Sequence, residues 1–229
     1  MYIRYRGVIV KKRVIIIVCS SIVTAILLAI VIPLMILGIR TANLTSDYSY
    51  LKNDENYSEK VEVQGLNLVT QHVSCGYASI EMVSEYYGNK VTEDDLDSRN
   101  SSVSTSSSSG FLNEINKSIS SKKFVMKSYL KHDDMLKEIY RSLKKGNPVV
   151  LEWSAKYKEE WTLHFSVITS LDIKNDTVTV YNPYGYIENL KLDEFLDRSS
   201  FNAYKNIPFF LSFGFAFGMF GKNTIFYAE

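Results

Sequence analysis

The chain has 229 residues with 26 basic and 25 acidic side chains, and 46% of its residues are hydrophobic. That hydrophobic fraction excludes a disordered or collagen-like chain, and two cysteines exclude a disulfide-stapled scaffold and a multi-cysteine zinc site. The charges are unevenly distributed, because residues 1–40 carry six basic side chains and no acid. Residues 41–229 therefore carry a net charge of −5, which argues against a nucleic-acid-binding surface.

Residues 14–39 contain no charge and consist mainly of Ile, Val, Leu and Ala. At 1.5 Å per residue such a helix spans about 39 Å, more than the ~30 Å hydrocarbon core of a bilayer. Five basic side chains lie in the tail 1–13 and only Arg40 follows, so the positive-inside rule predicts a cytoplasmic N-terminus. We expect a single-pass signal anchor that contacts the lipid bilayer through residues 14–39, with an extracytoplasmic C-terminal domain. The alternative is a cleaved signal peptide, whose apolar core is normally about 7–15 residues long.

Residues 40–60 are polar and lack helical periodicity, so we expect a tether followed by a folded domain over residues 61–229. The spacing of apolar residues in 71–88 predicts a helix with one buried face, which Gly88 ends. A second short helix is expected from Thr92. The Ser- and Thr-rich run 101–109 is expected to be a loop that leads into a helix near residues 111–118.

The second half of the domain changes from helical to strand periodicity. Residues 133–145 predict a helix with one apolar face, and the later elements alternate with a period of two. We expect strands at 148–153, 163–172, 177–181 and 224–228, and a short helix at 192–198. The apolar stretch 209–220 is too short to span a membrane and is interpreted as a buried strand or loop, with core packing favoured over a substrate groove. Helices followed by an antiparallel sheet indicate an α+β domain.

Cys75 is the only cysteine outside the apolar segment, because Cys19 lies within it. It lies in Ser74-Cys75-Gly76 at the expected start of a helix, where backbone amides and the helix dipole stabilise a thiolate. Gly76 would let a substrate backbone approach closely. Composition alone leaves a buried, inert cysteine as an equal alternative to a reactive one.

Gln71 and one of three histidines are candidate partners for this thiol. The side-chain amide of Gln71, four residues before Cys75, could donate a hydrogen bond to an oxyanion. His132 is expected to cap a helix or to be exposed, and His72 to be exposed or to contact a loop. His164 lies in a predicted strand and is the candidate base, although a histidine there is more often a satisfied core residue.

Asn182 ends the next predicted strand, eighteen residues after His164. Its carbonyl could accept a hydrogen bond from Nδ1–H of His164 and leave Nε2 as the base toward sulfur. The alternative is an ordinary turn at Asn182-Pro183. The few histidines offer no convincing metal site, and we expect neither a metal nor a cofactor.

Four motifs of the C39-like cysteine peptidases, which have a papain-like fold, resemble segments within residues 62–200. The first motif is similar to Gln71-x3-Cys75-Gly76-x-Ala78-x3-Met82-Val83-x2-Tyr86-Tyr87-Gly88 followed by Val91-Thr92-Glu93, and the later ones to Lys145–Val150, His164–Ile168 and Val178–Gly185. The resemblance implies N-terminal helices packed on an antiparallel sheet. It also implies roles for four residues: Cys75 as nucleophile, His164 as general base and acid, Asn182 as orienter and Gln71 as oxyanion donor.

The chain departs from the family pattern at two positions. The family usually has Pro at the position of Tyr77, a change that should be harmless in the first turn of a helix, and Asp at that of Asn182. Papain-like enzymes use Asn in this role, so we expect weakened support for His164 and not a dead site.

These observations predict a membrane-anchored cysteine peptidase that acts through a thioester on exported peptides or envelope proteins, with a Cys75 thiolate paired with a His164 imidazolium. Two alternatives stay open: a catalytically silent peptide-binding module, and a thiol amidase or acyltransferase acting on envelope glycopeptides. The best-known C39 domains clip double-glycine leader peptides beside an ABC exporter. We do not expect that role, because this chain has no ATP-binding motif and a single expected span.

Overall fold

The computed structural model describes residues 2–100 and 105–229, and it divides the chain into two units, residues 1–39 and 40–229. Helix α1 (Tyr2–Thr41) makes up the first unit and ends just inside the second. By length and composition its portion Ile17–Thr41, with a mean hydropathy of 3.0, could cross a membrane. A signal sequence would pass the same test, so the signal anchor stays a prediction.

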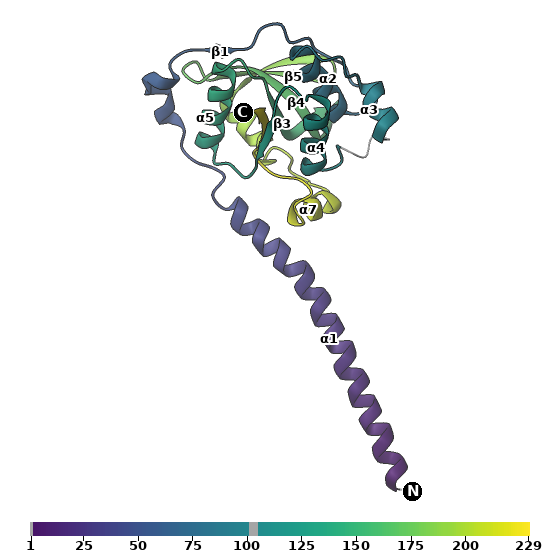
Figure 1. Ribbon diagram of the computed structural model, residues 1–229. Helices are drawn as coiled ribbons and strands as arrows, with labels where there is room; N and C mark the ends of the chain where they lie inside the picture. Colours follow the sequence, from purple (N-terminus) through teal and green to yellow (C-terminus); the bar gives the residue numbers. More distant parts are fainter. Residues whose placement is uncertain (1, 101–104) are drawn as a thin grey trace. The chain divides into compact units, whose positions relative to one another are not determined.

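The second unit is built on an antiparallel sheet (Figure 1). In the described part of the chain the strand order is β2-β7-β3-β4-β5-β6, and β1 also pairs with β4. The strands are β1 (Val61–Glu62), β2 (Phe124–Lys127), β3 (Val149–Tyr157), β4 (Glu160–Asp172), β5 (Thr177–Asn182), β6 (Tyr186–Lys191) and β7 (Thr224–Ala228). The helices of this unit are α2 (Cys75–Tyr86), α3 (Glu93–Asn100), α4 (Ser108–Ser118), α5 (His132–Lys144), α6 (Leu192–Ser199) and α7 (Phe209–Ala216), with 3-10 turns at Ser49–Asn53 and Glu55–Tyr57.

Both faces of the sheet are buried, and each face has its own apolar core. Alternate residues of β3 point to opposite faces, so Leu151 and Trp153 pack with α5 and α6 while Val150 packs with α2 and α4. Figure 1 shows α2 and α4 together, and α5 apart from them. The expected α+β class, with helices preceding an antiparallel sheet, is confirmed.

The predicted elements are present with shifted ends. The helix expected over 71–88 begins at Cys75, and the one expected near 111–118 begins at Ser108 because Ser107 caps it by accepting a hydrogen bond from Gly110 N–H. Part of the loop expected at 101–109, residues 101–104, lies outside the described residues. Strands β1, β2 and β6 were missed, since they are short or largely polar.

Residues 40–60 pack on the domain, so the structure does not bear out the expected tether. Leu44 and Leu51 are buried, and Leu51 belongs to the core on the α5 side. Ser46 Oγ donates a 2.6 Å hydrogen bond to Asp133, and Tyr48 donates one of 2.6 Å to Asp193. A few apolar side chains, separated by polar ones, hold the segment on the domain. Because their spacing follows neither a helix nor a strand period, the sequence pattern did not indicate this packing.

The apolar stretch 209–220 is helix α7 and the turn after it, so its interpretation as a buried strand or loop was wrong. Leu211 and Phe215 are buried against the domain. Phe209 and Phe210, in contrast, are 81% and 75% exposed. Core packing therefore accounts for only part of this segment.

Candidate active site

Cys75 is the first residue of α2, as the sequence predicted. Ser74 caps the helix, and its hydroxyl accepts a 3.1 Å hydrogen bond from the backbone N–H of Tyr77. The half-buried thiol therefore lies among the free backbone amides of a helix N-terminus. The amides of Cys75 and Gly76 both lower the pKa of the thiol, although burial outweighs them.

Glu93 holds the loop that leads to Cys75. Its carboxylate is fully buried and accepts hydrogen bonds from the backbone N–H groups of His72 (2.8 Å) and Ser74 (2.9 Å). It also pairs with Nδ1 of His72 at 2.6 Å. His72 itself is exposed, as expected, and a hydrogen bond to Asp94 and the charge of Glu93, both on α3, raise its pKa. Glu93 thus sets the path of the chain immediately before the thiol.

The space beside Gly76 is filled by the protein's own Thr105. A Cβ atom built on Gly76 would lie 2.5 Å from Cβ of Thr105, and Thr105 Oγ1 lies 3.2 Å from the hydroxyl of Ser74. The expectation that Gly76 leaves room for a substrate backbone was therefore wrong. The glycine instead allows Thr105 to pack against the start of α2.

Gln71 lines a cavity of about 440 Å³ together with Thr70, His72, Tyr157, Thr162, Pro183 and Tyr184. Its backbone N–H donates a 2.7 Å hydrogen bond to the carbonyl of Pro183, which docks the loop on the turn after β5. Gly185 completes that turn with a φ of +97°, and its Cα faces Thr70 closely. Within the described residues the buried Oε1 of Gln71 has no hydrogen-bond partner.

His164 on β4 and Asn182 at the end of β5 are hydrogen-bonded across the two strands. Nε2 of His164 lies 2.8 Å from Oδ1 of Asn182, and this oxygen also accepts a 3.0 Å bond from the backbone N–H of Tyr184. Since Oδ1 can only accept, Nε2 carries the proton and Nδ1 is the basic nitrogen. The pairing of these residues was predicted, but the assignment of the two ring nitrogens was reversed.

The orientation of the Asn182 amide is determined by Glu188 on β6. Nδ2 of Asn182 donates a 2.7 Å hydrogen bond to Oε1 of Glu188, so Oδ1 must face His164. Glu188 forms a two-point ion pair with Arg198 on α6, with N–O distances of 2.6 and 3.1 Å. The guanidinium in turn lies 3.7 Å above the ring of Trp153 and donates to the carbonyl of Ser154. A largely buried chain therefore runs from His164 through Asn182 and Glu188 to Arg198.

Tyr184 covers the imidazole. Its ring stacks on that of His164 with a centroid distance of 4.0 Å, and its hydroxyl lies 2.8 Å from that of Thr162. His164 is 1% exposed as a result. The stacked ring separates the His164–Asn182 hydrogen bond from solvent.

The thiol of Cys75 lies beside the strand that carries His164. The backbone amide of Phe165, the next residue, lowers the pKa of the thiol. Burial acts in the opposite direction and raises the pKa of Cys75 to about 11. Burial also lowers the pKa of His164 to about 3, against the Asn182 hydrogen bond. Both shifts favour the neutral thiol and imidazole, not the expected thiolate–imidazolium pair.

The third histidine takes no part in this site. His132 is the first residue of α5 and is only 5% exposed, so it is neither an exposed residue nor a side-chain cap. Its backbone N–H donates to the carbonyl of Leu44, and burial lowers the pKa of its ring. Among the described residues, no group of three or more His, Cys, Asp or Glu side chains could hold a metal ion.

Sequence reasoning missed four residues that support this site: Glu93, Tyr184, Glu188 and Arg198. Glu188 had a usable signal, because a hairpin after Asn182 with Gly185 at its turn brings residue 188 onto the same face. Glu93 stands at the end of the first motif, but that motif did not indicate its role, and Arg198 gave no signal because it reaches the site from a separate helix.

A comparison with protein-family models matches residues 61–209 to the Peptidase_C39-like family. The chain belongs to this family. The match covers β1 to the start of α7 and includes the cysteine, histidine and asparagine described above. The resemblance to this family that the motifs indicated is thereby confirmed.

Two further comparisons complete this picture. No curated protein sequence matches the chain. Among solved structures, it is similar to a double glycine motif protease from an AMS/PCAT transporter, which was crystallised with a leader peptide. The two are 14% identical with a TM-score of 0.46, and the match covers 75% of this chain and 99% of that one.

Proposed function

We propose that this C39-like protein is a cysteine peptidase with Cys75 as nucleophile and His164 as general base and acid. The observation that carries the proposal is the hydrogen bond from Nε2 of His164 to Asn182, which leaves Nδ1 as the basic nitrogen on the strand beside the thiol. A thiol at a helix N-terminus next to an oriented imidazole is the arrangement that thiol acyl transfer requires.

In the proposed reaction the neutral pair transfers a proton as the attack occurs. Sγ of Cys75 bonds to the carbonyl carbon of the substrate while its proton moves to Nδ1 of His164. His164 then gives that proton to the leaving amine, and a thioester remains on Cys75. Water attacks the thioester with His164 accepting its proton, and release of the acid restores the thiol. Asn182 keeps the ring in one orientation throughout these steps.

The developing oxyanion needs hydrogen-bond donors that are already in position. The backbone N–H of Cys75 at the start of α2 is one, and the side-chain amide of Gln71 is the second. Support comes from the position of Gln71 at the wall of the 440 Å³ cavity and from its docking on Pro183. The same cavity, between the Gln71 loop and Tyr184, is the proposed substrate site.

The apolar portion of α1 is proposed to be an uncleaved anchor with its N-terminus in the cytoplasm. The peptidase domain then faces the outside of the cell membrane, and its substrates are exported peptides or envelope proteins. Five basic side chains before the span and one after it support this orientation.

The proposal is tested with the full chain in detergent or nanodiscs and a mixed peptide library read by mass spectrometry. Wild-type protein should produce new peptide termini, and Cys75→Ala and His164→Ala should not. Thermal unfolding of both variants should stay close to that of the wild type, which separates loss of chemistry from loss of fold. Equal cleavage by Cys75→Ala would refute the assignment of the nucleophile.

A second candidate function is a peptide-binding module without turnover. The raised pKa of the half-buried Cys75 thiol favours it, because the resting site holds little thiolate at neutral pH. The same library distinguishes the two: a silent module retains peptides on both wild-type and Cys75→Ala protein and generates no new termini. The amidase or acyltransferase alternative would instead give amine-dependent products.

A further inference from the structure

Helix α7 presents a row of exposed aromatic side chains. Phe209, Phe213 and Phe217 follow one another at helical spacing of four residues, with ring centroids 6.0 and 4.2 Å apart. They are 81%, 36% and 49% exposed, and Phe210 beside them is 75% exposed. Met219 extends the same apolar segment. Exposed apolar clusters of this kind mark surfaces that meet a partner or a membrane.

The opposite side of α7 is fixed to the domain. Phe215 is buried and packs against Phe201 with a centroid distance of 4.8 Å. Gly214 lies so close to Phe220 that a Cβ atom would be 2.8 Å from its ring. The carbonyl of Met219 accepts a 2.8 Å hydrogen bond from the backbone of Ser108. The exposed phenylalanines therefore project from a helix held in place and do not belong to a loose segment.

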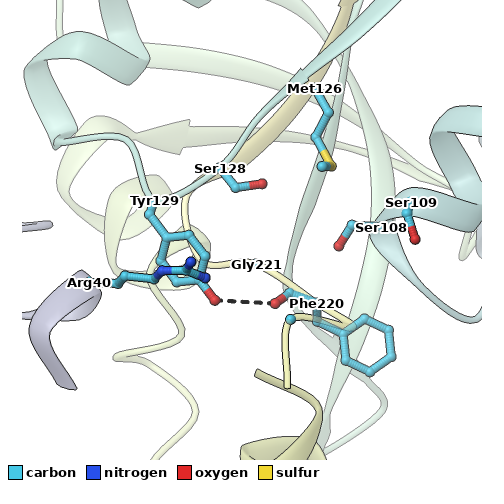
Figure 2. Close-up of a pocket in the computed structure, with 9 residues that line it drawn as sticks. Arg40, Ser108, Ser109, Met126, Ser128, Tyr129, Phe220 and Gly221 are labelled. Carbon is cyan, nitrogen blue, oxygen red and sulfur yellow. Dashed lines mark hydrogen bonds between the residues drawn. The ribbon is translucent and has the colours of Figure 1, made fainter. Parts of the chain in front are cut away.

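The chain enters the domain beside α7. Arg40, the first residue of the second unit, lines a pocket of about 450 Å³ together with Gly218 and Phe220, the residues that follow α7 (Figure 2). Its guanidinium lies 5.6 Å from the ring centroid of Tyr129. The hydroxyl of Tyr129 donates to the carbonyls of Phe215 and Phe220 at 3.4 and 3.3 Å. Tyr129 thus links the point where the apolar segment ends to the exposed helix.

The charges around α7 suit a lipid surface. Residues 199–228 contain Lys205 and Lys222 and no acidic side chain, and Lys205 is exposed. Phenylalanine rings prefer the boundary between acyl chains and headgroups, and nearby lysines interact with anionic headgroups. A surface beside Arg40, where the proposed span ends, can reach that boundary without any extended linker.

We propose that α7 inserts its exposed phenylalanines into the outer surface of the same membrane that holds α1, so that the domain rests on the bilayer at two points. This inference rests on the proposed anchor but not on peptidase activity. The proximity of Arg40 to the α7 segment is a property of the domain alone, and therefore it does not depend on the direction that residues 1–39 take.

The test places a tryptophan on α7 and measures its contact with lipid. Full-length Phe210→Trp is reconstituted, one chain per disc, into nanodiscs of phosphatidylcholine and phosphatidylglycerol with brominated acyl chains, which quench tryptophan on contact. Ile187→Trp is the matched control, because Ile187 is an apolar side chain, 48% exposed, on β6. The parent chain supplies the background from Trp153 and Trp161.

We expect the added emission of Phe210→Trp to be quenched at least twofold by brominated lipid and that of Ile187→Trp to be unchanged. Unquenched, water-exposed emission from Phe210→Trp would overturn the proposal. A tryptophan that is shielded from water only with two chains per disc would overturn the proposal in favour of self-association. Shielding that appears only on adding peptide would overturn it in favour of substrate binding. The intact mass of the chain recovered from cell membranes tests the anchor separately, because a cleaved segment would be missing from it.

Discussion

Asn182 donates a 2.7 Å hydrogen bond to Glu188, and this contact determines which way its amide faces. The amide oxygen is thereby presented to His164. The carboxylate of Glu188 thus stabilises the orientation of the imidazole through Asn182, without contacting the ring itself. C39-like peptidases usually have Asp at the position of Asn182. In this chain the negative charge belongs to Glu188, which lies behind Asn182 and forms an ion pair with Arg198.

Glu188→Gln should lower kcat about tenfold with little change in KM, because Asn182 can then present either side of its amide to the imidazole. Cleavage kinetics on a substrate from the peptide library measure both constants. Glu194→Gln is the matched control, since Glu194 is an exposed carboxylate 3.7 Å from the same Arg198. A tenfold loss in both variants would point to a general effect of charge around Arg198 and contradict the positioning role.

Asn182→Asp is expected to impair the protein, although Asp is the usual residue of the family. The new carboxylate would face Oε1 of Glu188 at the 2.7 Å distance now bridged by an N–H donor. Two carboxylates so close repel each other, which should cost roughly 1–3 kcal/mol of unfolding free energy. Thermal unfolding measures this loss, and adding Glu188→Gln should recover most of it. An unchanged unfolding midpoint in the single variant would disprove the contact.

Alkylation of Cys75 should be slow at neutral pH and rise toward alkaline pH. Burial raises the pKa of the thiol to about 11, so the thiolate fraction grows about tenfold per pH unit between pH 7 and pH 10. Iodoacetamide labelling followed by mass spectrometry gives the rate at each pH, with Cys75→Ala showing the background from Cys19. Rapid labelling near pH 5 that His164→Ala abolishes would show that an ion pair forms instead.

Gly76→Ala should destabilise the domain by roughly 1–3 kcal/mol, because the added methyl group overlaps Thr105. Chemical unfolding in detergent measures the loss. Thr105→Ala leaves Cβ of residue 105 in place and removes only its outer atoms, so the double variant should recover the stability only in part. If the single variant is as stable as the wild type but loses activity, the space beside Gly76 belongs to the substrate after all.

Stability should fall as pH rises from about 5 to 8 because of Glu152. This side chain is fully buried on β3, and burial raises its pKa to about 8, despite hydrogen bonds from Ser108 and Gly221. The folded state therefore binds a proton that the unfolded state has lost, and the stability present below pH 4.5 decreases by roughly 5 kcal/mol as pH rises through 8. Glu152→Gln should remove this dependence in thermal unfolding across pH, whereas exposed Glu55→Gln should retain it.

Local pattern determined much of the fold. The spacing of apolar residues after Cys75 placed this cysteine near a helix start, because helical spacing is a short-range signal. The closing strand 224–228 was predicted with its observed bounds, since its neighbours contain turn residues. His164 and Asn182 came together because β4 and β5 are adjacent antiparallel strands, and the pairing of Val167 with Tyr181 brings the end of β5 close to His164.

Tertiary contact decided the rest. The packing of residues 40–60, the carboxylate of Glu93 under the cysteine loop and Thr105 against Gly76 all join segments distant in sequence. The protonation states were also beyond the sequence, because desolvation depends on how completely neighbours such as Tyr184 cover a group. The apolar residues of 209–220 were visible in the sequence, but which of them face solvent was not. Only the packing of α7 on the domain through Phe215 decides that its other phenylalanines remain uncovered.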